Sequence, residues 1–231
     1  MSQETLTIIL GAGITIALIV IGVFIIILLS KEFNKLKSSR KSDNTINNKQ
    51  ISSYNNYDEF LVYKILKEVK EEIGGHILQN IIIKDNLNRL TEIDLIYINK
   101  TGIYVIEVKG WKGTIFGDEE SKNWNVINND FNEKRENPIK QNLNHIEILS
   151  NYLDRSINIC SLIVFTNGNI DSIEHDSVCR VDELKDILFD RDEEVLSDLE
   201  VENYFNKLKR FVDNPVMSHK EYVDYINNLH N

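Results

Sequence analysis

The sequence has few cysteines and no closely spaced pair of cysteines or histidines. Cys160 and Cys179 are its two cysteines, no CxxC motif is present, and the five histidines are scattered along the chain. Zinc sites usually draw on Cys and His ligands at short, regular spacings. The sequence therefore contains no zinc-binding pattern, and we expect both cysteines to be reduced thiols in the core or on the surface.

A surplus of positive charge is also missing. The chain carries 26 Lys and Arg against 36 Asp and Glu, which gives a formal net charge of -10. Proteins that bind nucleic acid over a broad surface neutralise many phosphates with Lys and Arg. Such a surface is not expected here, so any contact with nucleic acid is predicted to be local or assisted by a metal ion.

One long stretch has no charge at all. Residues 6–29 read LTIILGAGITIALIVIGVFIIILL, and about 20 apolar residues suffice for a helix to cross a bilayer. A cleaved signal peptide is not favoured, because the preceding MSQET has no basic residue and no small-residue cleavage site follows. Basic residues follow the run and none precedes it, which predicts a single-pass protein with its N-terminus outside and its larger part in the cytoplasm.

The composition divides the chain into four segments. We assign residues 1–30 to the transmembrane anchor and residues 31–56, which are rich in Ser, Asn and Lys, to a flexible polar tether with a basic front part. Residues 57–170 form the predicted folded domain, and residues 171–231 form a helical C-terminal extension.

Apolar periodicity predicts the elements of the folded part. An amphipathic helix is expected at 58–73, a strand at 77–83, a hairpin over 91–110, a second hairpin from 113–117 and 124–127, a helix from Pro138, and a buried strand at 159–165. Further helices are expected at 181–188, 194–211 and 218–229, the last with a Ser218–Glu221 capping box. This order favours an α/β fold with a mixed sheet.

The first hairpin carries charges among its apolar residues. If Ile98 pairs with Ile103 across the turn, Asp94 lies opposite Glu107 and Glu92 opposite Lys109, on one face. Directly opposed carboxylates repel, and Mg²⁺ or Mn²⁺ held between them removes that conflict. In the alternative, the two carboxylates face solvent at a sheet edge and Lys109 forms an ordinary ion pair with Glu92.

The same stretch carries a family resemblance. IDLIYINKTGIYVIEVKGWKGTIFG, with NPIKQN opening the next helix, resembles the core of the nuclease-related domain, NERD, which is similar to the PD-(D/E)xK nuclease superfamily. The resemblance covers roughly residues 58–165. It implies a restriction-endonuclease-like mixed sheet flanked by helices, and metal-dependent hydrolysis of phosphodiester bonds in nucleic acid, with DNA favoured as substrate.

The resemblance also implies roles for particular residues. Asp94 and Glu107 would hold the Mg²⁺ or Mn²⁺ ion, with the Val108 carbonyl as a further ligand. Lys109 would orient or activate the attacking water.

Two more residues match the family pattern outside the hairpin. Glu59 matches the acidic residue of the first helix, and Gln141 matches the glutamine of the later helix. As alternatives, both are solvent-exposed helix residues, with Glu59 favoured in a first turn by the helix dipole. The sequence departs from the pattern at Asp58, where family members usually have Gly before the Glu.

Other polar and aromatic residues have two interpretations. Trp111 and Trp124 would stack on bases or pack in the core, and packing is favoured. Lys134 and Arg135 would contact phosphate or lie in a solvated loop, and the loop is favoured. His145 is expected on the same helix face as Gln141. A lone histidine is usually structural.

Two functions from different classes remain. The first is a membrane-anchored, cytoplasm-facing nuclease that acts on nucleic acid. The second is a catalytically inactive nuclease fold that serves as a binding or scaffold module at the membrane, with its C-terminal helices contacting a protein partner.

Overall fold

The computed structural model describes residues 57–85, 87–153, 157 and 159–229. The predicted transmembrane helix at 6–29 and the tether at 31–56 lie outside these residues. Within the part of the chain that the structure describes, every helix is too short or too polar to cross a membrane. Both cysteines are free, as expected, with Cys179 buried and Cys160 partly buried.

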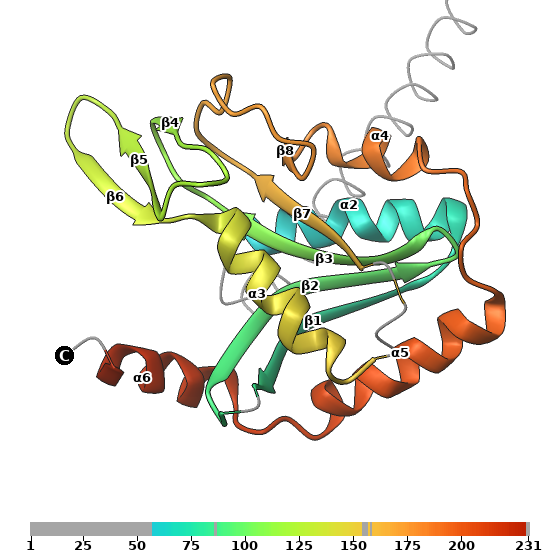
Figure 1. Ribbon diagram of the computed structural model, residues 1–231. Coiled ribbons are helices and arrows are strands. Elements are labelled where there is room, and N and C mark those ends of the chain that lie inside the picture. The colour runs from blue at the N-terminus through green and yellow to red at the C-terminus, as the bar shows by residue number, and fades with distance from the viewer. Residues whose placement is uncertain (1–56, 86, 154–156, 158, 230–231) are drawn as a thin grey trace, which may run out of the picture. The chain divides into compact units, whose positions relative to one another are not determined.

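A mixed sheet lies at the centre of the described residues (Figure 1). Its strands follow the order β1 (His76–Lys84), β2 (Leu90–Asn99), β3 (Gly102–Lys109), β7 (Ile159–Phe165) and β8 (Val178–Arg180). β1, β2 and β3 are antiparallel neighbours, whereas β3, β7 and β8 are parallel. The predicted mixed sheet is confirmed, and the short strand β8 was missed.

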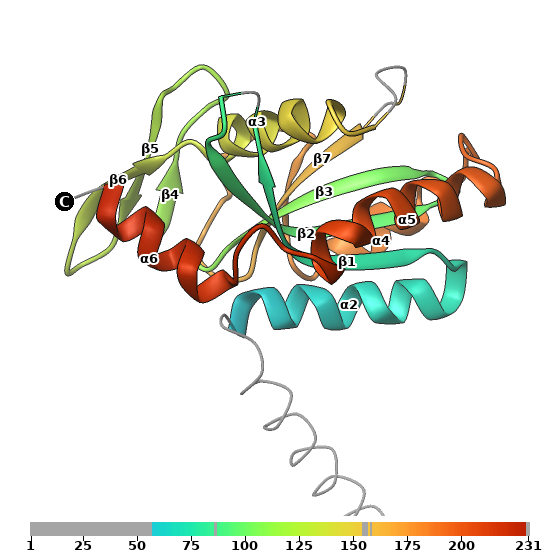
Figure 2. The same cartoon turned by 90° about the horizontal axis from the view of Figure 1, so that it is seen from below.

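Helices cover both faces of this sheet (Figure 2). On one face, α2 (Tyr57–Ile73) and α4 (Leu184–Phe189) share an apolar cluster with the sheet; α2 contributes Val62, Leu66 and Val69, at helical spacing. On the other face, α3 (Pro138–Ser150) and α5 (Asp198–Asp213) pack in the same way. This arrangement fits a nuclease-like fold.

The last helix, α6 (His219–Leu229), has no fully buried side chain among its described residues 219–228. The predicted capping box at its start is confirmed, because Ser218 Oγ accepts from the Glu221 N–H and Glu221 Oε2 accepts from the Ser218 N–H. An equivalent box, Ser197 with Glu200, starts α5.

A small antiparallel sheet extends from the end of β3. It consists of β4 (Thr114–Phe116), β5 (Asn123–Ile127) and β6 (Asn132–Glu136). The first two strands were expected. The interpretation of Lys134 and Arg135 as loop residues is wrong, since both lie in β6. That strand reads NEKRE, and a strand without an apolar residue gives no periodic signal.

The faces of β1 and β2 exchange part-way along these strands. Ile93 and Ile96 belong to the same core cluster, although strict alternation would place them on opposite faces. Asn80, on the adjacent strand, has a left-handed backbone with φ 50° between the paired positions Gln79–Leu95 and Ile81–Ile93. The alternation therefore shifts by one residue at Asp94.

Candidate active site

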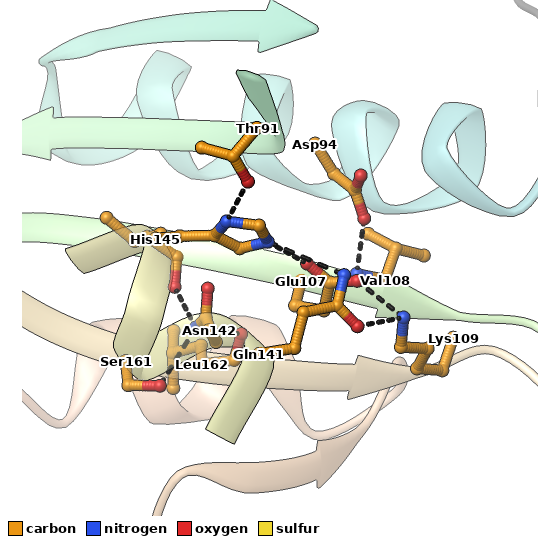
Figure 3. A network of polar contacts seen from close by, with 11 residues as sticks. Thr91, Asp94, Glu107, Val108, Lys109, Gln141, Asn142, His145, Ser161 and Leu162 are labelled. Carbon is orange, nitrogen blue, oxygen red and sulfur yellow. Dashed lines mark hydrogen bonds and ion pairs between the residues drawn. The ribbon is translucent and has the colours of Figure 1, made fainter. Parts of the chain in front are cut away.

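Glu107, near the end of β3, is at the centre of a polar network under α3 (Figure 3). Its side chain is buried, with the residue 2% exposed. One carboxylate oxygen, Oε1, accepts a hydrogen bond from Lys109 Nζ at 2.5 Å. The other, Oε2, lies 3.2 Å from His145 Nε2 but accepts no hydrogen bond from a described residue.

Lys109 joins the strand to the helix. Its Nζ donates to Gln141 Oε1 at 3.0 Å as well as to Glu107. The side chain is 14% exposed, so this ammonium group lies at the edge of the solvent. The predicted pair of Glu107 and Lys109 is thus assembled with Gln141 in one contact network.

Asp94 lies where β2 separates from β3. The predicted register is confirmed at Ile98–Ile103 and Ile96–Val105, but the ladder ends at Leu95–Ile106. The expectation that Asp94 and Glu107 face each other as ladder partners is wrong, because the carboxylate of Asp94 takes the place of a backbone acceptor. Its Oδ2 accepts the Val108 N–H at 2.8 Å.

Glu92 does not pair with Lys109, contrary to the expected register. The shift in alternation turns Thr91 toward α3, where its Oγ1 lies 2.9 Å from His145 Nδ1. Glu92 Oε1 instead lies 2.6 Å from His219 Nδ1, at the start of α6. The alternative in which Lys109 forms a simple surface pair with Glu92 is therefore not observed.

The two carboxylates differ in acidity. Burial raises the pKa of Asp94 well above its usual range, and the negative charges of Glu107 and Glu59 raise it further. Burial also opposes ionisation of Glu107, but Lys109 and His145 outweigh it and lower the pKa of that carboxyl. The ionised form of Glu107 is therefore stabilised by neighbouring donors, whereas the ionised form of Asp94 is destabilised by the negative charges around it.

Glu59 lies in the first turn of α2, near enough for its charge to act on Asp94. The preceding residue anchors this turn: Asp58 Oδ1 accepts hydrogen bonds from Thr166 Oγ1 and Asn167 Nδ2 beyond the end of β7. Asp58 departs from the family pattern, but through these hydrogen bonds it holds the start of α2 beside the site.

The start of α3 is fixed by Asn137. Its Oδ1 accepts from the Ile139 N–H, which caps the helix, and Pro138 occupies the first turn. Its Nδ2 donates to the carbonyls of Asp118, Glu119 and Ser121. These contacts hold α3 against the loop after β4, and Gln141 follows one turn later.

Sequence reasoning gave no role in this network to His145 or Asn142. His145 was interpreted as an isolated structural residue, yet it is 4% exposed and lies between Thr91 and Glu107. Asn142 is fully buried, and its Nδ2 donates to the Val105 and Leu162 carbonyls. The spacing of Gln141 and His145, four residues apart on a helix, placed both on one face, but nothing in the sequence indicated the contacts of His145 with Thr91 and Glu107.

The residues present fit a divalent cation. Mg²⁺ is typically held by one or two carboxylates together with water and phosphate oxygens. Glu107 Oε2 is a buried acceptor with no hydrogen bond, and Asp94 has an electrostatic surplus that a cation would relieve. No group of three or more His, Cys, Asp or Glu side chains is gathered for a metal among the described residues, so water or substrate oxygens would complete the coordination.

Known proteins are similar to the part of the chain that contains the candidate active site. Residues 54–166 match the family model of the nuclease-related domain, NERD. A Bacillus anthracis protein described as uncharacterized is 28% identical over 109 residues, which are 46% of this chain and 50% of that relative. The chain thus spans half the length of the relative. The family match includes Asp94, Glu107, Lys109 and Gln141.

Proposed function

We propose that this nuclease-related domain hydrolyses phosphodiester bonds of nucleic acid, with DNA favoured, using Mg²⁺ or Mn²⁺. The observation that carries the proposal is the arrangement around Glu107: a buried carboxylate with one oxygen bound to Lys109 and the other without a hydrogen bond, close to the charge of Asp94. A buried carboxylate oxygen is seldom left without a hydrogen bond, and Glu107 Oε2 has only the ion-pair contact with His145.

The chain's own groups suit this chemistry. Asp94 and Glu107 would hold the cation, and the Val108 carbonyl is proposed as a further ligand. The bound cation would lower the pKa of a water molecule and neutralise charge on the phosphate. Lys109, at the solvent edge and held by Gln141, would orient the attacking water and stabilise the negative charge that develops on the phosphate.

Supporting roles follow from the contacts. Gln141 keeps Lys109 Nζ from turning wholly toward Glu107. Glu59 adds negative charge near Asp94, which would strengthen cation binding. The acidic surface is compatible with this activity, because the cation and Lys109 act locally.

We also propose that the domain works at the cytoplasmic side of a membrane. This rests on the uncharged run at residues 6–29 and on the basic residues that follow it. Its substrates would then be nucleic acids that come close to the membrane.

A nuclease assay on the full-length chain in detergent tests the proposal. Linear, circular and single-stranded DNA and RNA are incubated with Mg²⁺, Mn²⁺ or a chelator. Cutting should require the metal and fall about 100-fold or more in Glu107→Gln and Lys109→Met. Glu71→Gln and Lys64→Met change the same residue types at exposed positions of α2 and should cut normally.

Two observations favour the scaffold alternative. Lys109 is already bonded to two side chains, and the described residues hold no group of three metal-ligand side chains. A folded chain that neither cuts any of these substrates nor binds Mn²⁺ would support the binding module and reject the nuclease.

A further inference from the structure

Trp111 lies at the rim of the candidate active site. It follows β3 by two residues and is partly exposed. The centroid of its ring lies 5.7 Å from Lys109 Nζ, and the ring packs against Phe165 at 5.6 Å. Trp124, the other tryptophan of the chain, is fully buried. The packing interpretation is confirmed for both tryptophans, but Trp111 packs at the edge of its core cluster and keeps part of its side chain exposed.

A second cation lies over the same indole ring. The guanidinium carbon of Arg135, from β6, is 5.4 Å from the ring centroid of Trp111. Its Nε and Nη2 donate to Glu133, and Nη1 makes no hydrogen bond with a described residue. The Arg135 side chain is 40% exposed. The small sheet thus brings an arginine to the tryptophan that adjoins the catalytic lysine.

The backbone under Trp111 is held on both sides. The Thr166 N–H donates to the Lys109 carbonyl at 3.0 Å, and the Asn169 N–H donates to the Gly113 carbonyl at 2.8 Å. Gly168 approaches closely enough that a Cβ there would lie 2.7 Å from the Trp111 carbonyl oxygen. A ring on such a fixed segment loses little conformational entropy when it binds a ligand.

We propose that Trp111 and Arg135 bind single-stranded nucleic acid: one unpaired base stacks on the indole where Arg135 now lies, and Arg135 turns from the ring to hold an adjacent phosphate. This rests on the proposed function only for the position of the scissile phosphate at Lys109. Because Lys109 Nζ lies 5.7 Å from the centroid of the indole ring, the stacked base would belong to a nucleotide next to the scissile bond.

The chemistry favours a single strand over a duplex. Stacking on an aromatic side chain needs an exposed base face, which a base inside a duplex does not offer. Tight binding to a duplex backbone needs many cations, and the net charge of the chain is -10. One aromatic ring with one arginine instead suits a local contact with an unpaired nucleotide.

Tryptophan emission reports this contact directly. The full-length chain in detergent and chelator is titrated with a short single-stranded oligodeoxynucleotide, so that binding is measured without cleavage. Emission should be quenched in the unmodified chain and unchanged in Trp111→Phe, where the buried Trp124 is the remaining tryptophan. Anisotropy of a labelled oligonucleotide supplies the affinity.

Variants separate stacking from charge. Trp111→Leu should weaken binding about tenfold. Arg135→Gln should weaken binding and reduce the salt slope by about 1. Glu133→Gln removes the negative charge beside Arg135 and should tighten binding, whereas Lys134→Gln, at an exposed cation on the other face of β6, should change affinity less than twofold.

The same titration is made with a blunt duplex of the same sequence. Three results would overturn the inference: no quenching of Trp111, affinities of Trp111→Leu and Arg135→Gln equal to that of the unmodified chain, or binding of the duplex that is equally tight and depends on the same two residues. Binding through Trp111 without metal-dependent cutting would uphold this site and reject the proposed hydrolysis. If metal-dependent cutting occurs and neither its rate nor the affinity depends on Trp111, the proposed hydrolysis is upheld and this binding site is rejected.

Discussion

Gly110 and the carboxylate of Asp58 share one small space beside the site. A Cβ built on Gly110 would overlap Asp58 Oδ2, while Oδ1 of the same carboxylate binds Thr166 and Asn167. Position 110 therefore needs a glycine, because Asp58, in the first turn of α2, fills the space that a Cβ would occupy.

Gly110→Ala should lower the free energy of unfolding by about 1–3 kcal/mol, since the added methyl group displaces Asp58. Asp58→Ala removes the carboxylate, so Gly110→Ala should cost much less in that background. Urea unfolding of both single variants and the double variant gives the coupling. Additive effects of the two substitutions would contradict the shared space.

Asp94→Asn should stabilise the metal-free chain at neutral pH. The pKa of Asp94 is raised on folding, so its protonated form favours the fold, and that contribution is lost as the pH rises through the folded pKa. The amide keeps an oxygen for the Val108 N–H. We expect a gain on the order of 1 kcal/mol, or about 2–4 °C in Tm.

The gain from Asp94→Asn should disappear as the pH falls below the ordinary carboxylate range, about 3.9. Added Mn²⁺ should raise the Tm of the unmodified chain and not that of the variant. Thermal unfolding in chelator and in Mn²⁺ across pH checks both. A variant that is less stable at pH 7 than at pH 4, relative to the unmodified chain, would contradict the assigned electrostatics.

Lys109→Met should destabilise the domain by about 3 kcal/mol, because Glu107 then remains buried as a charge without its ammonium partner. Glu107→Gln combined with Lys109→Met removes both charges and should recover most of this loss. Because the pKa of Glu107 is lowered on folding, its contribution is present above the unfolded pKa and lost as the pH falls through the folded pKa. Denaturant unfolding at pH 7 and pH 4 measures it; equal stability of the single and double variants would refute the pairing.

Part of the geometry of the hairpin formed by β2 and β3 was predictable from the sequence. The turn and the apolar pattern fix the register, so Ile98–Ile103 and Ile96–Val105 were predicted and confirmed. The separation of the strands at Asp94 was not predictable from that pattern. It accompanies a left-handed backbone at Asn80, on a different strand.

The site was predicted in the same partial way. The family resemblance named Asp94, Glu107, Lys109 and Gln141, which the structure brings into one region, while their chemical roles stay predictions. The contact of Thr91 with His145 joins residues 54 positions apart, and no local periodicity encodes such a contact. β6 escaped detection because its neighbours, not its own side chains, make it a strand.

Asn142 ties α3 to both strands that carry the site. Its Nδ2 donates to the Val105 carbonyl of β3, and to Ser161 Oγ and the Leu162 carbonyl of β7. Asn142→Leu keeps the approximate volume but removes these hydrogen bonds, so it should cost about 2–3 kcal/mol. Asn144→Leu, on the exposed side of the same helix, should change stability by less than about 0.5 kcal/mol.

Asn142→Leu should also disturb Gln141, its neighbour on α3, and with it the bond to Lys109. We therefore expect the rate of the proposed cleavage to fall at temperatures where the variant is still fully folded. Circular dichroism establishes the folded fraction, and cleavage is measured under the same conditions. A variant that loses stability but cuts at the normal rate when folded would show that Asn142 supports the fold alone, and that Gln141 is held in place by Lys109 instead of by the helix.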